Sequence, residues 1–244
     1  MENKAISIAV IALIAGFAIG FLVANRLNRS ELESLRSENA RLKEPPANGE
    51  ENGATLSDDE IRTRIKKADD DPGNLEYQRN LGIALYRYAS MKKDVPLLNE
   101  STRLLKRVLE ADKSSVDANT ALGNAYFDIG YFSQDSASYA VSRQYYEVAL
   151  KQRPDDSSVR TDYGLTFFLQ QPPDYDRALA EFEKSLRSDP KNEKALEFTT
   201  QAYLKKNDTV NAQKALDRLK TARPDNASIA GLTAALATTA QPAK

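Results

Sequence analysis

Apolar and small side chains recur in a fixed order between residues 72 and 224. In each unit a small residue is followed four positions later by a large apolar one, and then by a mostly apolar pair three positions on. These spacings place the side chains on one face of a helix. A proline or its replacement closes each unit, at intervals of 41, 41, 36 and 34 residues: Pro72, Lys113, Pro154, Pro190 and Pro224. The small and large residues are Ser101 and Leu105, Ser142 and Tyr146, Ala178 and Phe182, and Ala212 and Leu216.

The upstream half of each unit carries a second recurring spacing, in which an apolar residue precedes glycine and a large residue follows three positions later. The matching segments are Leu81-Gly82 with Leu85, Leu122-Gly123 with Tyr126, Tyr163-Gly164 with Phe167, and a degenerate Thr199-Thr200 with Tyr203. Together the two halves resemble the tetratricopeptide repeat (TPR), a helix-turn-helix unit of 34 residues. The tryptophan of that pattern is absent, and Gln78, Asn119, Arg160 and Leu196 stand in its place. The resemblance implies an all-α fold, a TPR superhelix (α-solenoid) with four repeats over residues 72–224 and insertions of seven, seven and two residues.

Polar residues indicate where the helices begin. Aspartates stand where each second helix should start, and asparagine, serine or aspartate stands before each first helix, because these side chains accept hydrogen bonds from free first-turn amides. They are Asp94, Asp135, Asp174 and Asp208, and Asn74, Ser115, Asp156 and Asn192. Ser57 and Glu60 predict a capping box for an N-terminal capping helix within residues 57–71. Residues 225–244 are expected to form a C-terminal capping helix and tail.

A long apolar segment precedes the repeats. After a short tail, residues 1–4, residues 5–24 carry no charge and only Ser7 is polar. Twenty helical residues span roughly 30 Å, the thickness of the hydrocarbon layer, which predicts a transmembrane helix and a single-pass membrane protein. A cleaved signal peptide is the alternative, although no clear cleavage site closes the segment.

Two features of this N-terminal part favour a homodimer. Gly16 and Gly20 lie on one face of the predicted membrane helix, where small residues allow close helix approach. In the predicted helical stalk, residues 25–43, Leu35, Asn39 and Leu42 follow a coiled-coil spacing. A chance abundance of glycine and a solvated stalk remain equally open interpretations. Residues 44–56 are rich in proline, glycine and polar residues and predict a flexible linker.

Composition argues against catalysis. The 244 residues carry a net charge of −1, and cysteine, histidine and tryptophan are all absent. The commonest general base and metal ligand is therefore missing, and no phosphate-binding loop or nucleophile motif appears. The sequence predicts a non-enzymatic protein without cofactor or metal, and the balanced charge gives no indication of nucleic-acid binding.

The resemblance to tetratricopeptide repeats implies that the first helices line a groove that binds a peptide segment. The candidate groove residues at the family's positions are Arg79, Tyr86, Arg87, Asn124, Phe127, Thr161, Leu165, Phe168, Lys194 and Gln201. We expect Phe127 and Phe168 to form an apolar floor and Asn124 to contact peptide backbone. The alternative is that the phenylalanines pack into the next repeat. The carboxylate clamp of the chaperone-binding members is not reproduced, because Thr161 and Leu165 replace its basic pair.

The inserted residues of the first two repeats carry aromatic and apolar side chains, which are Tyr88, Met91, Tyr131, Phe132 and Tyr139. They predict either a second contact surface or a cover for lengthened helices.

The sequence thus predicts a membrane-tethered interaction scaffold or co-chaperone whose partners are peptide segments or subunits of a membrane complex. Its layout is similar to bacterial-type repeat proteins that assist periplasmic chaperones or cytochrome c maturation. A structural assembly factor that dimerises through its anchor and stalk is the alternative. The same similarity favours an extracytoplasmic (periplasmic) domain, whereas Arg26 and Arg29 favour the cytoplasmic side.

Overall fold

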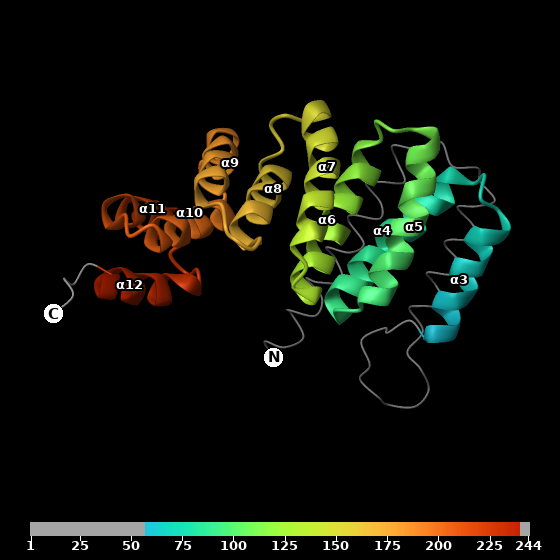
Figure 1. Ribbon diagram of the computed structural model, residues 1–244, viewed down its shortest axis with the longest axis horizontal. Helices are drawn as coiled ribbons and strands as arrows, with labels where there is room; N and C mark the ends of the chain where they lie inside the picture. The colour runs from blue at the N-terminus through green and yellow to red at the C-terminus, as the bar shows by residue number, and fades with distance from the viewer. Residues whose placement is uncertain (1–56, 240–244) are drawn as a thin grey trace, which may run out of the picture. The chain divides into compact units, whose positions relative to one another are not determined.

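The computed structural model describes residues 57–239, which form ten helices and, within that range, no strand (Figure 1). The helices are α3 (Asp58–Asp70), α4 (Leu75–Lys92), α5 (Val95–Ala111), α6 (Val116–Ser133), α7 (Ser136–Gln152), α8 (Ser157–Leu169), α9 (Tyr175–Ser188), α10 (Glu193–Lys205), α11 (Thr209–Ala222) and α12 (Ser228–Thr239).

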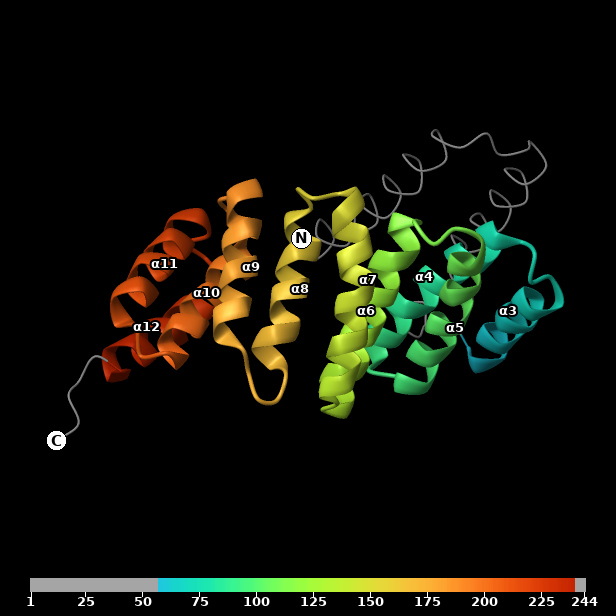
Figure 2. The same cartoon turned by 45° about the horizontal axis from the view of Figure 1, so that its top comes forward.

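Consecutive helices pack as hairpins, and the hairpins stack in chain order. The most extensive contacts join α4 to α5, α6 to α7, α8 to α9 and α10 to α11, and Figure 2 shows the two helices of the third hairpin joined by a short loop. Each hairpin then packs on the next through its second helix, while the first helices α4, α6, α8 and α10 also contact one another in order. The described chain is therefore an all-α solenoid of four helical hairpins.

The two helices of a hairpin approach most closely at glycine. A Cβ atom on Gly123 would lie 2.5 Å from the ring of Tyr146, which is fully buried. The Ser142 hydroxyl donates to the Gly123 carbonyl at 2.7 Å, and Ser101 makes the same bond to Gly82. The glycine and the small residue of the sequence pattern are thus one contact, made once in each of these hairpins.

The predicted helix starts are present with one exception. Asp94, Asp135, Asp174 and Asp208 each accept a first-turn amide, and the capping box of Ser57 and Glu60 is formed. Ser115 occupies the start of α6, but its side chain makes no cap hydrogen bond. The Ser115 carbonyl instead accepts a bond from the Asn119 side chain, at 2.8 Å.

The insertions lengthen helices rather than forming free loops. Both first helices of the first two repeats, α4 and α6, have 18 residues, whereas α8 and α10 have 13. Their second helices have 17 residues against 14 in α9 and α11. Each long first helix ends in a left-handed residue, Lys93 with φ 56° or Gln134 with φ 54°, which reverses the chain into the next helix.

Polar side chains replace tryptophan by bonding the turn that precedes their own repeat. Gln78 is fully buried and donates to the Asp71 carbonyl at 3.2 Å. Asn119 donates to the Lys113 carbonyl at 3.0 Å. Arg160 donates to the carbonyl of Pro154, also at 3.0 Å. In the fourth repeat Leu196 fills the position as a fully buried apolar residue.

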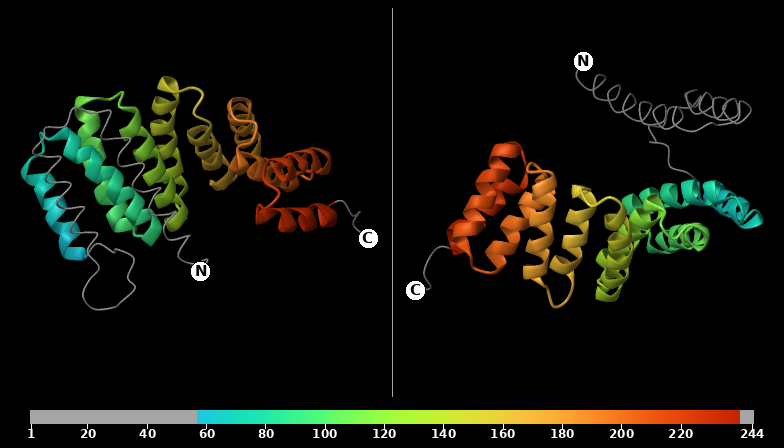
Figure 3. Two further views of the ribbon diagram at one scale, coloured as in Figure 1. Left: turned by 180° about the vertical axis from the view of Figure 1, so that it is seen from behind. Right: turned by 90° about the horizontal axis from the view of Figure 1, so that it is seen from above.

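Short helices cover both ends of the hairpin stack. Helix α3 packs on α4, and α12 packs on α10 and α11 (Figure 3, where α12 is the red helix nearest the C-terminus). Leu232 and Leu236 are the buried side chains of α12. Within residues 57–239 no helix combines the length and the apolarity that crossing a membrane requires. The predicted tail, membrane helix, stalk and linker lie outside the described residues.

Candidate partner-binding face on the first helices

The first helices share one face on which polar and aromatic side chains from neighbouring repeats interact. We call its central group the first-helix cluster and define it as Tyr86 on α4, Asn124 and Asp128 on α6, Asp162 on α8, and Lys194 on α10. The cluster therefore spans all four repeats, since helices α4, α6, α8 and α10 contact each other in sequence.

Asn124 connects the cluster to the core through hydrogen bonds. Its side-chain oxygen accepts a hydrogen bond of 2.7 Å from the hydroxyl of buried Tyr146, and its amide interacts with the Tyr86 hydroxyl. Burial raises the pKa of Tyr86 well above its ordinary range, and the carboxyls of Asp128 and Asp162 raise it further. Because both ends of the Asn124 amide are engaged within the protein, its main task is to hold Tyr86 and Tyr146 in place.

Two carboxyl groups lie on this face, and one ammonium group acts on both. The Lys194 Nζ atom lies 2.7 Å from an oxygen of Asp162. Burial raises the pKa of Asp162, and Lys194 opposes the rise. Burial likewise raises the pKa of Asp128, which a hydrogen bond from Ser90 opposes and the negative charge of Asp162 reinforces. Within residues 57–239, the buried Oδ2 atom of Asp128 has no hydrogen-bond partner.

An aromatic ring borders the charged groups. Phe127 is half-buried, packs edge-on against Tyr139 with 5.6 Å between ring centroids, and has Lys194 Nζ 6.0 Å above its ring. Burial raises the pKa of Tyr139 to about 12, so its hydroxyl stays protonated at neutral pH. The face consequently offers apolar surface beside hydrogen-bonding groups, the combination that peptide segments bind.

Three of the predicted groove residues lie in the core instead. Thr161 is 1% exposed, and its hydroxyl bonds the Ser157 carbonyl and the Ser185 hydroxyl. Leu165 is equally buried. Phe168 is 9% exposed and packs edge-on against Tyr175 and Phe198. These side chains stabilise the junction between repeats, and we remove them from the candidate binding surface.

The remaining predicted groove residues reach solvent to different degrees. Arg87 is exposed, while Arg79 and Gln201 are half-buried. The Gln201 amide donates to Glu197 one turn earlier on α10, at 3.1 Å. The predicted dimerisation residues Gly16, Gly20, Leu35, Asn39 and Leu42 lie outside the described residues.

The predicted groove residues include Lys194 but not Asp162, the carboxylate with which it pairs. Thr161 occupies the family's groove position but points into the core. The next residue, Asp162, faces Lys194 on the first-helix face instead. The sequence contained a sign of this arrangement: Asp162 lies in the middle of a first helix, two residues before Gly164. Burying a carboxylate there is unfavourable unless a cation or a hydrogen-bond donor pairs with it.

The aromatic side chains of the inserted residues mainly cover the lengthened helices. Tyr139 is buried, and Tyr88 and Phe132 are half-buried against the core of the first repeat. Met91 and Tyr131 are exposed, and Tyr131 contacts Phe132 edge-on at 5.8 Å. Most of this apolar surface is thus already in use.

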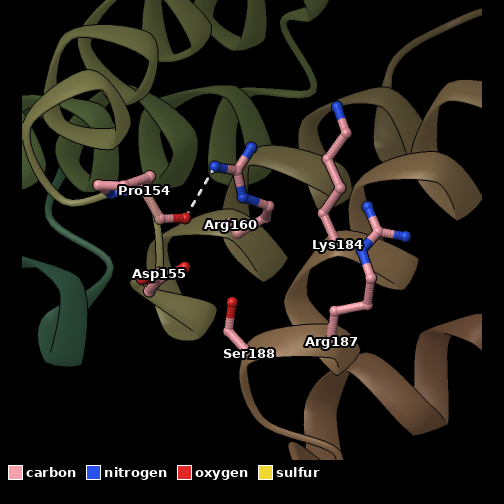
Figure 4. Close-up of a pocket in the computed structure, with 6 residues that line it drawn as sticks. All are labelled: Pro154, Asp155, Arg160, Lys184, Arg187 and Ser188. Carbon is pink, nitrogen blue, oxygen red and sulfur yellow. Dashed lines mark hydrogen bonds between the residues drawn. The ribbon is translucent and has the colours of Figure 1, made fainter.

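Two shallow hollows lie away from the first-helix face, at the turns between repeats. One, of about 300 Å³, lies between the turn after α7 and the end of α9 and is lined by Pro154, Asp155, Arg160, Lys184, Arg187 and Ser188 (Figure 4). Buried Glu181 pairs with two of its cations, Arg160 at 3.1 Å and Lys184 at 2.6 Å. The second hollow, of about 310 Å³, lies at the same place one repeat later and is lined by Pro190, Lys191, Asp217, Arg218, Thr221 and Ala222. Because they recur with the repeat, we interpret them as features of turn packing.

The described residues supply hydrogen-bonding and charged groups on the first-helix face. No group of three or more acidic side chains within residues 57–239 is placed to hold a metal ion. The half-buried carboxyl, amide and hydroxyl groups and the exposed ammonium group of the first-helix cluster can form hydrogen bonds and ion pairs with a bound segment.

Comparisons with known proteins agree with this architecture. Two tetratricopeptide-repeat family models match, at residues 134–193 and 173–236, so the chain contains tetratricopeptide repeats. The comparison with curated proteins gave no match.

Several solved structures share the fold. One is a double mutant of MamA from strain RS-1, with 15% identity and a TM-score of 0.59, covering 84% of this chain and 99% of that one. Residues 41 to the end of MamA from Desulfovibrio magneticus RS-1 show 15% identity and a TM-score of 0.52, with 68% and 83% covered. A thermophilic TPR protein of Thermus thermophilus shows 14% identity and a TM-score of 0.51, with 75% and 89% covered.

Proposed function

We propose that this protein is a membrane-tethered, non-enzymatic interaction scaffold whose first-helix face binds a peptide segment of a partner protein. The observation that carries the proposal is the first-helix cluster. Tyr86, Asp128, Asp162 and Lys194 come from four successive first helices and remain partly exposed, and Lys194 lies over the ring of Phe127. Side chains needed only for packing would be buried, as Leu165 and Phe168 are.

Two further arguments support a scaffold. Tetratricopeptide-repeat proteins bind other proteins, and stacked repeats present extended surfaces suited to long segments. The tether rests on the apolar segment of residues 5–24, which would concentrate the repeats at the cell membrane. Following the layout of similar repeat proteins, we place the repeats on the extracytoplasmic side.

The test compares two variants of the full chain in partner capture. A photo-reactive residue at Arg87, the exposed predicted groove residue beside Tyr86, should crosslink a segment of a partner protein in intact cells. The variant Phe127→Ala should reduce that crosslink strongly, whereas Arg218→Ala on α11, outside the first-helix face, should leave it unchanged. Retained capture in Phe127→Ala together with loss after deletion of residues 25–43 would favour the assembly factor that dimerises through its anchor and stalk.

Membrane orientation is a separate measurement. A reporter that is active on one side of the membrane only, fused after Lys244, should be active outside the cytoplasm. Activity inside would contradict the extracytoplasmic placement and leave the binding face as proposed.

A further inference from the structure

Two arginine side chains lie over one buried aromatic ring where α7, α8 and α9 pack together. The ring is that of Phe167 on α8, which is 6% exposed. The Cζ atom of Arg143, on α7, lies 4.6 Å from the ring centroid, and the Cζ atom of Arg177, on α9, lies 5.7 Å from it. None of these three residues belongs to the first-helix cluster. The junction of the second and third repeats therefore gathers two positive charges outside the proposed binding face.

Arg143 is the half-buried arginine of the pair, and most of its N–H donors are unused. Its Nη1 atom donates to the carbonyl and the hydroxyl of Thr166, at 3.4 and 3.3 Å, which is longer than is typical for such bonds. Within residues 57–239, its Nε and Nη2 atoms donate to no partner, and the buried side-chain atoms that lack a partner belong to Asp128 and Thr199 instead. The unused Arg143 donors are therefore open to solvent and can be reached by a ligand.

The charges around Arg143 leave it without a direct counter-ion. Burial lowers the pKa of its guanidinium, and the positive charge of Arg177 lowers it further. Tyr163, Glu147 and Asp174 oppose that shift, but both carboxylates are bound to other groups. Glu147 accepts a hydrogen bond from the Tyr163 hydroxyl at 2.8 Å. Asp174 caps α9 by accepting the Arg177 amide at 3.0 Å and lies 3.5 Å from Arg177 Nε. A half-buried cation in this position gains from an anion that contacts it directly.

A carboxylate is the ligand that suits these donors. A guanidinium group presents its N–H groups as a planar fork that matches the two oxygens of a carboxylate. The Arg177 side chain is 72% exposed, so its positive charge also attracts an arriving anion. A phosphate dianion would bring two negative charges near Glu147 and Asp174, and a neutral amide would leave Arg143 without a counter-ion.

We propose that Arg143 is the centre of a second binding site, where its open N–H donors bind a carboxylate of a partner protein and Arg177 adds positive charge. The carboxylate belongs to an aspartate or glutamate side chain or to a chain terminus. The site shares no residue with the first-helix cluster, so the inference goes beyond the proposed function and is tested separately from it.

The probe is N-acetylglutamic acid amide, whose single carboxylate imitates a side chain of the partner, and N-acetylglutamine amide is its neutral match. Each is titrated at neutral pH and constant ionic strength into the detergent-solubilised full chain, isotope-labelled at arginine Nε. The Nε–Hε signals are followed by nuclear magnetic resonance, and Arg143→Lys identifies the Arg143 signal by its absence. We expect a saturable shift of the Arg143 signal with the glutamic acid probe and no shift with the glutamine probe.

Variants of the protein test the part that each arginine takes. Arg177→Gln removes one nearby positive charge from an exposed position and should weaken binding at Arg143 by about threefold. In Arg143→Lys, which keeps the charge but removes the planar fork, the remaining arginine signals should show no saturable shift. The control Arg218→Gln, an exposed arginine on α11, should bind as the wild type does. Thermal unfolding of each variant checks that it is folded.

Three results would overturn the proposal. They are equal shifts with the glutamic acid and glutamine probes, unchanged affinity in Arg177→Gln, and tighter binding of inorganic phosphate than of the glutamic acid probe in the same titration. None of them affects the crosslink expected from Arg87 on the first-helix face, so failure of this site is distinguishable from failure of the proposed function.

Discussion

The first two repeats and the last two form the same kind of helix hairpin from helices of different length. Helices α4 to α7 have 17 or 18 residues, and α8 to α11 have 13 or 14. In both regions a glycine of the first helix meets a large side chain of the second: Gly82 with Leu105, Gly123 with Tyr146, and Gly164 with Phe182. The crossing point is therefore maintained while the helix ends vary, because only the crossing demands close backbone approach.

The family models match the part of the chain where the spacing is shorter, from residue 134 to residue 236. The seven-residue insertions of the first two repeats fall inside helices, after the glycine and before the small residue of each pattern. Extra turns there leave every contact at the crossing intact but change the sequence distance between the two halves of a repeat. The long repeats therefore depart from the 34-residue spacing although they keep the same helix crossing.

The position of the missing tryptophan distinguishes the fourth repeat from the other three. In the first three repeats, Gln78, Asn119 and Arg160 bond carbonyls of the preceding turn, and in the fourth Leu196 is packed in an apolar core. A polar side chain can thus replace a large ring because it satisfies backbone groups that the turn leaves unpaired. The C-terminal repeat relies on apolar burial instead.

The largest expected effect distinguishes the crossings of the two regions. In Gly123→Ala the new methyl group meets the Tyr146 ring at 2.5 Å, and that ring is fully buried and held by Asn124. We expect a loss of about 3 kcal/mol in the free energy of unfolding, measured by chemical denaturation. Gly164→Ala meets the Phe182 ring at 2.7 Å, and since a phenylalanine ring has no polar tie, the loss should be smaller, about 2 kcal/mol.

Gly231→Ala is the control for these glycine substitutions. Nothing lies within 4 Å of the new methyl group in α12, so the higher helix propensity of alanine should stabilise the protein by roughly 0.8 kcal/mol. If Gly164→Ala costs as much as Gly123→Ala, the hydrogen bond from Tyr146 to Asn124 contributes nothing to the rigidity of the second crossing.

A middle-sized effect is expected from making the second repeat resemble the fourth. Asn119→Leu removes two hydrogen bonds, to the carbonyls of Lys113 and Ser115, and places an apolar side chain at a buried position. We expect a loss of about 1–2 kcal/mol in the free energy of unfolding, because buried carbonyls lose their donors. Leu196→Met, which keeps the volume and the apolar character, should cost less. Equal stability of Asn119→Leu and the wild type would show that the turn carbonyls find other donors.

The smallest effect concerns the first-helix cluster and has a defined dependence on pH. Burial raises the pKa of folded Asp128, so folding favours the protonated carboxyl. Its favourable contribution is present below the pKa of the unfolded chain and is lost as pH rises through the folded pKa. Asp128→Asn should therefore stabilise the protein by about 1 kcal/mol at pH 7, and the gain should shrink towards pH 4. The measurement is the difference in free energy of unfolding between variant and wild type at the two pH values.

Asp135→Asn, in the same repeat, should change the free energy of unfolding in the opposite direction. Hydrogen bonds from Ser138 and from the Ala137 amide lower the pKa of Asp135, so its contribution is present at pH 7 and is lost as pH falls through the folded pKa. The variant should be destabilised at neutral pH, with a difference that fades on acidification. A stabilising Asp135→Asn, or a destabilising Asp128→Asn at pH 7, would contradict the electrostatic account of these two aspartates.

The sequence by itself determined the hairpins, their number and most of their helix starts. Helix periodicity, the glycine at three of the four crossings and the aspartate caps are local signals, carried by residues within one or two turns of each other. They do not depend on how one repeat is rotated against the next. Ser115 shows the limit of such local signals, because its side chain does not cap α6. The Asn119 side chain bonds the Ser115 carbonyl and the preceding turn instead, a role that no local rule predicts.

Only the tertiary structure decided which side chains of the first helices face solvent. The resemblance to tetratricopeptide repeats placed Thr161, Leu165 and Phe168 in the groove, but the packing of α8 against α9 and α10 buries all three and turns Asp162 towards Lys194. The rotation of a helix about its axis is fixed by the volumes of side chains on three helices at once, and those side chains lie up to a whole repeat apart in the chain. A periodic pattern defines which residues share a face, whereas close packing across repeats decides where that face points.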